Sequence, residues 1–302
     1  MIDYEPHSWS SVLLRIRGTV LQGIALRLVA VAGVGLFAAG VHAQYGIKIP
    51  AIAHTLVGVA LGLLLVFRTN ASYDRYWEGR RLLGAITNRS RDLVRQLVSY
   101  VTPLGEEERV RVVRHVSLLY ALVRQLLRRE RELSALGPLV TADERVLLEP
   151  VTCRPTYAAA WISQSLARAA AEGRLSEQRL QLLDANLTAI VDAWGGAERI
   201  MKTPIPFAYA HHIKAFLVIF CATAPFAMVD AMGWHTPIAA VVLAFALLGI
   251  DEIGVEIEDP FGYDPNDLPL DRIGETIAGD TAALAKLAVP EATEVASRDR
   301  AS

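Results

Sequence analysis

The sequence of 302 residues contains little cysteine and none of the short motifs that mark common enzymes. It has two cysteines, Cys153 in a polar stretch and Cys221 in an apolar one, which exclude a disulfide framework. It also lacks CxxC, HExxH, GxSxG, GxGxxG and P-loop motifs, which serve metal binding, hydrolysis and nucleotide binding. We therefore expect no enzyme activity, no catalytic residues, no cofactor and no metal site.

What the sequence does contain is long apolar runs. Hydrophobic residues make up 53% of the chain and the mean hydropathy is +0.32, yet 21% of residues are charged, which indicates a membrane part joined to a polar part. A helix needs about 20 mostly apolar residues to cross a bilayer. Pro225 and Pro237 are expected to interrupt the last two of the four runs, which are Leu28–Ile47, Ala51–Phe67, Ala215–Val229 and Ala231–Ile250.

Four such runs favour an all-α membrane protein with four transmembrane helices and a helical cytoplasmic domain. The alternative is that they are buried helices of a soluble protein, which would load one core heavily for a chain of this length. Helical spacing of apolar residues continues between the second and third runs, where Thr102-Pro103 and Gly137-Pro138 are expected to separate helices.

The distribution of Lys and Arg predicts the orientation of the runs. Only Lys48 lies between the first two runs and none lies between the last two, whereas arginines are frequent before the first run and after the second. We expect a multi-pass protein of the cell membrane with both termini in the cytoplasm. The expected parts are a cytoplasmic segment 1–27, a hairpin 28–67, a cytoplasmic helical region 68–207, a hairpin 208–250 and an acidic cytoplasmic tail 251–302 with a disordered end.

Charge is distributed unevenly between two of these parts. From Arg68 to Leu133 there are 14 arginines and 8 acidic residues, and from Asp251 onward there are 13 acidic and 4 basic residues. The tail is expected to pair with the basic helices of the same or a neighbouring subunit. The basic surface has two further interpretations, contact with anionic lipid heads or a solvated face that follows the positive-inside bias.

The second run carries the most information. Gly58 and Gly62 form a GxxxG pair, which permits close helix packing. Val59, Leu63 and Phe67 recur every four residues on one adjoining face. Around a shared axis this stripe would form a narrow hydrophobic neck that gates ions by dewetting. The alternative for such a stripe is a face turned to lipid or to the core.

Histidines offer no clear metal site. His211 and His212 point about 100° apart on a helix, so they are poor ligands for one metal, and a surface or interface role is favoured. His54 lies inside the second run, where a pore-facing position, a helix–helix hydrogen bond or a place near the outer interface all remain open. The sequence leaves open whether any of these side chains senses pH.

Three blocks of the sequence, in order, resemble a known family. They read GLLLVFRTNASYDRYWEGRRLLGAI from Gly62, TPIPFAYAHHIKAF from Thr203 and IEDPFGYDPNDLP from Ile257. Together they are similar to the bestrophin family in its shorter bacterial form. The resemblance implies a homopentameric ion channel around one central pore, with Val59, Leu63 and Phe67 as the neck. It also implies a lower cytoplasmic aperture, which maps near Leu187, with Ile190 as the alternative.

The resemblance also bears on calcium and on ion selectivity. In animal relatives an acidic calcium-binding cluster follows the Pro-Phe-Gly sequence of the third block. At the corresponding positions 263–267 this chain has only two acidic residues, Asp264 and Asp267. Since calcium takes 6–8 oxygen ligands, we expect no calcium gating. By resemblance to bacterial relatives we expect monovalent cations to permeate, with Asp264 and Asp267 as candidate cation-attracting carboxylates. The alternatives are an anion channel of the same fold, a non-conducting membrane scaffold and a small-solute transporter.

The expected partners are therefore further copies of the chain, the lipid bilayer and monovalent ions. No nucleic acid is expected.

Overall fold

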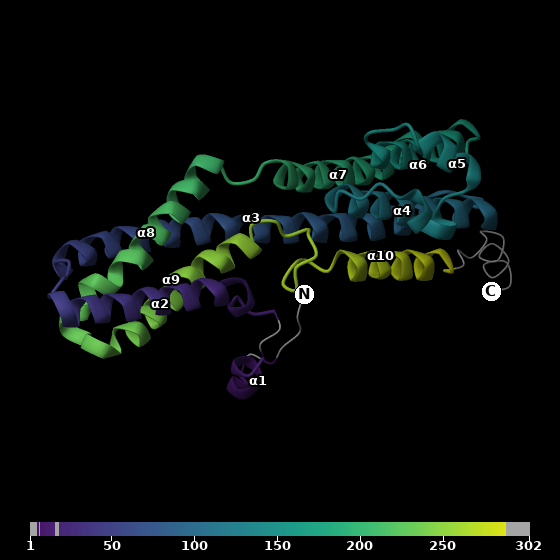
Figure 1. The fold of residues 1–302 in the computed structure, drawn as a ribbon. Coiled ribbons are helices and arrows are strands. Elements are labelled where there is room, and N and C mark those ends of the chain that lie inside the picture. The colour runs from purple at the N-terminus through teal and green to yellow at the C-terminus, as the bar shows by residue number, and fades with distance from the viewer. Residues whose placement is uncertain (1–4, 6, 16–17, 288–302) are drawn as a thin grey trace, which may run out of the picture. The chain divides into compact units, whose positions relative to one another are not determined.

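The computed structural model describes residues 5, 7–15 and 18–287, and in these ranges all regular structure is helical (Figure 1). This confirms the all-α prediction. The predicted disordered end lies in residues 288–302, outside the described ranges. The elements are α1 Trp9–Leu13, α2 Leu21–Tyr45, α3 Ala51–Tyr100, α4 Glu106–Leu127, the 3₁₀ helix η1 Leu133–Leu139, α5 Ala142–Leu148, α6 Arg154–Ala171, α7 Glu177–Lys202, α8 Phe207–Met232, the 3₁₀ helix η2 Gly233–His235, α9 Thr236–Glu256 and α10 Leu270–Ala285.

The chain divides into two compact units. Unit 1 comprises residues 1–78 and 203–268, and unit 2 comprises residues 79–202 and 269–302. Helix α3 contributes residues to both units, because its 50 residues run without a break through the end of the second apolar run.

Unit 1 holds the apolar runs. Within the described residues, three helical stretches are long and apolar enough to span a membrane, namely Leu21–Tyr45, Ala51–Tyr100 and Phe207–Glu256. The last stretch contains both α8 and α9, separated by the short helix η2. The break falls at Gly233, whose φ of 50° favours glycine.

The expectation that prolines interrupt the last two runs was wrong for Pro225, and the break in the last run falls at Gly233–His235, just before Pro237. Pro225 lies inside α8, which continues on both sides of it. Pro237 lies in the first turn of α9, where a missing backbone N–H costs no helical hydrogen bond.

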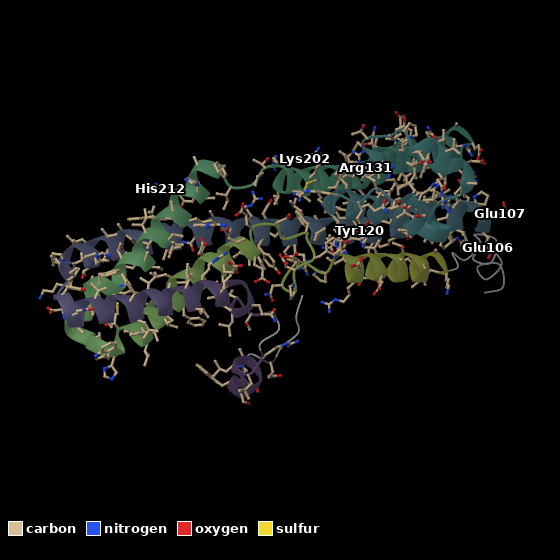
Figure 2. The ribbon with its side chains drawn as sticks, in the orientation of Figure 1. Glu106, Glu107, Tyr120, Arg131, Lys202 and His212 are labelled. Atoms are coloured by element: carbon tan, nitrogen blue, oxygen red, sulfur yellow. The ribbon has the colours of Figure 1, made fainter. Side chains whose placement is uncertain are left out.

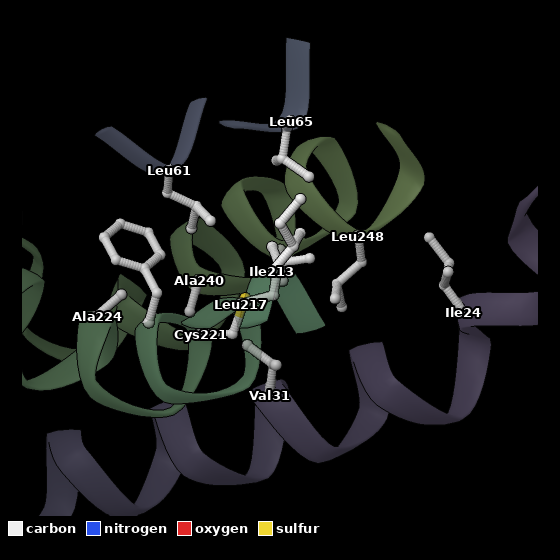
Figure 3. Close-up of a cluster of buried hydrophobic side chains, with 12 residues drawn as sticks. Ile24, Val31, Leu61, Leu65, Ile213, Leu217, Cys221, Ala224, Ala240 and Leu248 are labelled. Atoms are coloured by element: carbon white, nitrogen blue, oxygen red, sulfur yellow. The ribbon is translucent and has the colours of Figure 1, made fainter. Parts of the chain in front are cut away.

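Unit 1 is held together by an apolar cluster among α2, α3, α8 and α9 (Figure 3). Helices α2 and α9 also lie side by side (Figure 1). They meet closely at Gly35, since a Cβ there would lie 2.7 Å from the Cα of Pro237. The buried members of the cluster are Ile24, Val31, Leu61, Leu65, Ile213, Leu217, Phe220, Cys221, Ala224, Ala240, Ala244 and Leu248.

The turns of the two hairpins are joined at one end of unit 1. The Lys48 ammonium lies 2.9 Å from the Asp230 carboxylate, and the Ile49 N–H donates to the Phe226 carbonyl at 3.0 Å. Lys48 and Ile49 precede α3, whereas Phe226 and Asp230 lie near the end of α8. Both hairpins therefore turn on the same side of the helical layer.

Unit 2 consists of amphipathic helices that bury leucine-rich faces. Helix α4 packs against α6 and α10, and the Tyr120 hydroxyl of α4 donates to the Leu270 carbonyl at 2.8 Å (Figure 2). Helices α6 and α7 are separated by a short loop. The chain turns at Gly173 with a φ of 73°, a left-handed conformation that glycine adopts without strain.

Acidic residues of α10 pair with arginines of the basic helices in unit 2. Asp271 lies 2.6 Å from Arg124 and 2.7 Å from Arg128, and Asp280 lies 2.5 Å from Arg91. The predicted pairing of tail and basic helices is thus confirmed within one chain.

Candidate pore-lining face

The stripe predicted for the neck lies on a face of α3 that the rest of the chain leaves uncovered. Val59, Leu63 and Phe67 are 62%, 55% and 63% exposed. The opposite face of the same helix is buried, with Leu61 at 0% and Leu65 at 1% exposure. Because one face packs inward and the other carries large apolar side chains outward, the stripe requires lipid or further copies of the chain to cover it.

The two glycines beside this stripe differ in their surroundings. A Cβ at Gly58 would lie 3.2 Å from the Phe220 ring of α8. A Cβ at Gly62 would have no heavy atom of another segment within 4 Å among the described residues. Gly58 therefore permits close packing inside the chain, whereas Gly62 leaves space on the uncovered side.

His54 joins α3 to α8. Its Nε2 lies 2.8 Å from the Thr223 hydroxyl oxygen, and its ring lies 5.5 Å from the Phe220 ring. Among the positions that the sequence left open, the structure shows the helix–helix hydrogen bond. His211 and His212 are exposed at the start of α8, and His212 is labelled in Figure 2.

The uncovered face becomes polar beyond Phe67. Asn70 and Asp74 are exposed, and Asp74 follows Phe67 by two helical turns on the same side. The stripe therefore ends in an amide and a carboxylate.

Behind this transition lies a buried ion pair that the sequence analysis did not predict. The Arg68 guanidinium of α3 donates to the Asp251 carboxylate of α9, and the two side chains are 2% and 3% exposed. Glu258 lies 3.8 Å from the same guanidinium. A buried charge is costly unless it is paired, so this pair fixes α3 against α9 where the apolar stripe ends.

The three sequence blocks that resemble a family meet through hydrogen bonds in unit 1. Arg75 donates to the Thr203 carbonyl at 2.5 Å and to the Glu258 carbonyl at 3.0 Å. The Tyr76 hydroxyl donates to the Asn266 carbonyl at 3.1 Å. The blocks therefore hold the polar end of the stripe in place. In the sequence, the residues that could have indicated these contacts are the consecutive Arg75, Tyr76 and Trp77.

The residues predicted for the cytoplasmic aperture are buried in unit 2. Leu187 is 3% and Ile190 0% exposed on the inner face of α7. Neither side chain reaches the surface of the single chain. The resemblance pointed to these positions because it did not distinguish the inner from the outer face of this helix. Exposed residues of the opposite face include Leu182 at 50%.

The two candidate cation-attracting carboxylates lie in different environments. Asp264 is exposed, whereas Asp267 is 3% exposed and its Oδ2 accepts the Asp264 N–H at 2.7 Å. Burial, reinforced by the charges of Asp264, Asp259 and Glu256, raises the pKa of Asp267 to about 7. Within the described residues, no group of three or more His, Cys, Asp or Glu side chains is placed to hold a metal ion.

The helical membrane-length segments and the uncovered apolar face are features of an integral membrane protein. The chain matches the family described as Bacterial/Fungal Bestrophin protein over residues 1–283. It therefore belongs to the bestrophin family, whose members are ion channels and not enzymes.

Individual relatives agree with this assignment. The chain is 38% identical, over 89% of each chain, to the voltage-dependent anion channel-forming protein alr2987 of Nostoc sp.. It is 35% identical, over 93% of each chain, to the protein sll1024 of Synechocystis sp., which has the same description. Its fold is similar to the crystal structure of a bacterial bestrophin homologue from Klebsiella pneumoniae, with a TM-score of 0.83 and 28% identity over 88% of this chain and 100% of that chain.

Proposed function

We propose that this protein is a channel in which five copies surround one axis and the stripe of Val59, Leu63 and Phe67 forms the neck of the pore. The observation that carries the proposal is the exposure of these large apolar side chains on a helix whose opposite face is buried. A single chain does not enclose a pathway with this face, so the proposal requires an oligomer. Native mass spectrometry in detergent tests the assembly, and five copies is the expected mass.

A neck of aliphatic and aromatic side chains has a simple mode of action. It offers an ion no ligands in place of its hydration shell, so a narrow neck dewets and blocks conduction, and a wider one passes hydrated ions. The neck therefore sets whether ions pass rather than which sign of ion passes. Asn70 and Asp74 begin the wider polar segment below it.

For selectivity we propose anions. The support is the description of relatives that are 38% and 35% identical over most of the chain, which are named anion channel-forming. The monovalent cations expected from the sequence are the second candidate. Asp74 supports them, since a ring of exposed carboxylates on the pore side would attract cations.

The expected topology and the absence of calcium gating belong to the same proposal. Hairpins 28–67 and 208–250 would cross the membrane, with residues 68–207, the tail and both termini in the cytoplasm. The joined turns at Lys48 and Asp230 support a common outer side for both hairpins. The burial of Asp267 supports channel opening without calcium. Its carboxylate accepts a hydrogen bond from the Asp264 N–H and is therefore not turned outward to bind an ion.

The test is a planar-bilayer recording of the purified protein under asymmetric potassium chloride. Unitary currents that reverse near the chloride equilibrium potential support an anion channel, and reversal near the potassium potential supports the second candidate. Saturable flux without unitary currents would indicate a transporter. Silence from correctly assembled oligomers would indicate a scaffold and would contradict the proposal.

A further inference from the structure

A cavity in unit 2 has polar features that the proposed pore does not use. It has a volume of about 210 Å³ and lies between α4, α5 and α6. At about 30 Å³ per water this is room for roughly seven waters or a small organic molecule. Its lining includes Arg111 and His115 from α4, Asp143 and Leu147 from α5, and Trp161 and Arg168 from α6.

The cavity carries two arginines without an ion-pair partner. Arg111 and Arg168 are both exposed, and among the described residues neither lies within ion-pair or hydrogen-bond distance of a carboxylate. Other arginines near this region are paired, as Arg114 is with Glu144 and Arg174 with Glu108. Two unpaired guanidinium groups at one cavity favour a carboxylate ligand, which a guanidinium binds through two parallel hydrogen bonds.

The floor of the cavity contains a buried polar atom without a partner. His115 is 5% exposed, and its Nδ1 makes no hydrogen bond. Its Nε2 lies 2.8 Å from Glu144 Oε1, to which Arg114 also donates at 2.7 Å. Although burial opposes ionisation of Glu144, hydrogen bonds from Arg114, Thr141 and His115 lower its pKa to about 2, so it is a carboxylate at neutral pH.

The protonation of His115 follows from this contact. Burial, which outweighs the bond to Glu144, lowers the pKa of the imidazole, so the ring is neutral at pH 7. A neutral imidazole has one N–H. Arg114 Nη2 also lies 3.0 Å from Nε2, but it already donates to Glu144 Oε1, which can only accept, so we assign the N–H to Nε2. Nδ1 is therefore a bare acceptor, which costs free energy until a donor reaches it.

We propose that this cavity binds an α-amino acid with an apolar side chain. Arg111 and Arg168 take the carboxylate, and the ammonium donates to His115 Nδ1 and pairs with Asp143. The side chain packs against Leu147, which is 53% exposed, and the Trp161 ring. The Trp161 ring lies 5.6 Å from the imidazole ring, so its fluorescence should report a ligand bound beside His115.

The test uses the full chain in lipid nanodiscs, with L-leucine as the probe and tryptophan fluorescence as the readout. We expect a saturable change with a Kd of about 1 mM or tighter, absent in Trp161→Phe. 4-Methylpentanoate lacks only the ammonium and L-leucinamide lacks the carboxylate. Each should bind at least about tenfold more weakly, since each leaves buried or charged groups unpaired.

Variants locate the binding site. Arg111→Gln and Arg168→Gln should each weaken leucine binding at least about fivefold. Arg199→Gln is the matched control, since Arg199 is an exposed arginine of α7 outside the cavity, and it should bind as the wild type does. Thermal melting confirms that the variants fold.

Three results would overturn the proposal. They are no saturable binding of leucine below about 10 mM, equal binding of 4-methylpentanoate, or displacement of leucine by chloride at the same concentration. The last result would show a simple anion site. None of them depends on whether the protein conducts, so failure here is distinct from failure of the proposed channel.

Discussion

The Arg68 guanidinium in α3 and the Asp251 carboxylate in α9 form an ion pair that is almost completely buried in unit 1. The two residues are 183 positions apart in the sequence. Such a pair contributes little net stability compared with an apolar replacement, but the loss of one partner leaves an uncompensated buried charge. Its position beside Phe67 links the stability of unit 1 to the geometry of the proposed neck.

Removal of one charge should therefore cost more than removal of both. Arg68→Met or Asp251→Leu alone should each destabilise the protein by about 3–5 kcal/mol, and the double variant should be closer to the wild type than either single variant. Thermal unfolding in detergent measures this cycle. The control is Arg27→Gln, because the Arg27–Glu252 pair is half exposed and should contribute about 1 kcal/mol or less. Additive losses in the cycle would contradict the coupling.

The two glycines of α3 separate packing within a chain from packing between chains. Gly58→Leu should destabilise the folded chain, since even a Cβ there lies 3.2 Å from the Phe220 ring. Gly62→Leu meets no described neighbour in its own chain, so its effect should appear in the assembly. Light scattering after size-exclusion chromatography should show smaller oligomers for Gly62→Leu. A full-sized oligomer with wild-type conductance would place Gly62 against lipid.

The neck predicts a gain of function on truncation. Leu63→Ala and Phe67→Ala should raise unitary conductance or open probability by about twofold or more, because a wider apolar constriction stays hydrated. Val218→Ala is the control, since Val218 is 66% exposed on α8 and is an apolar residue outside the stripe. Bilayer recording of the three variants measures the effect. If all three conduct as the wild type does, the stripe faces lipid.

The raised pKa of Asp267 predicts how stability depends on pH. The native state holds this proton up to about pH 7, whereas in the unfolded chain the carboxyl titrates near its ordinary pKa of 3.8. Between these values the native state binds more protons than the unfolded state, so stability falls as the pH rises. The loss has an upper limit of about 4 kcal/mol. Asp267→Asn should flatten the pH dependence of the melting temperature between about pH 4 and pH 7. If the pH dependence of the melting temperature is unchanged in this variant, other titrating groups cause it.

The features of the fold and of the candidate pore face that could be predicted from the sequence are those that depend on residues close together in the chain. The apolar runs and the spacing of Val59, Leu63 and Phe67 are local patterns, and helix periodicity places them on one face. The sequence did not reveal that α3 continues without a break beyond Phe67. At that point the residues change from apolar to polar, but the helix itself does not end.

Contacts between residues far apart in the chain could not be predicted from the sequence. The Arg68–Asp251 pair depends on how α9 packs against α3, which periodicity does not specify. Leu187 and Ile190 are apolar residues of α7 that fit a core or an aperture equally well in a pattern, and only packing in unit 2 showed that they are buried. The break at Gly173 was not predicted, because a single glycine in an otherwise helical pattern does not by itself specify the end of a helix.

The most direct test of the central claim is thiol modification of the stripe in a conducting channel. Leu63→Cys would be made in a Cys153→Ser, Cys221→Ala background, with Val218→Cys as the matched control. A small charged methanethiosulfonate reagent would be added during bilayer recording. If the stripe lines the pore, current through Leu63→Cys channels should fall irreversibly while Val218→Cys channels are unaffected. Persistent current through Leu63→Cys channels, with labelling confirmed by mass, would show that this face does not line the pathway.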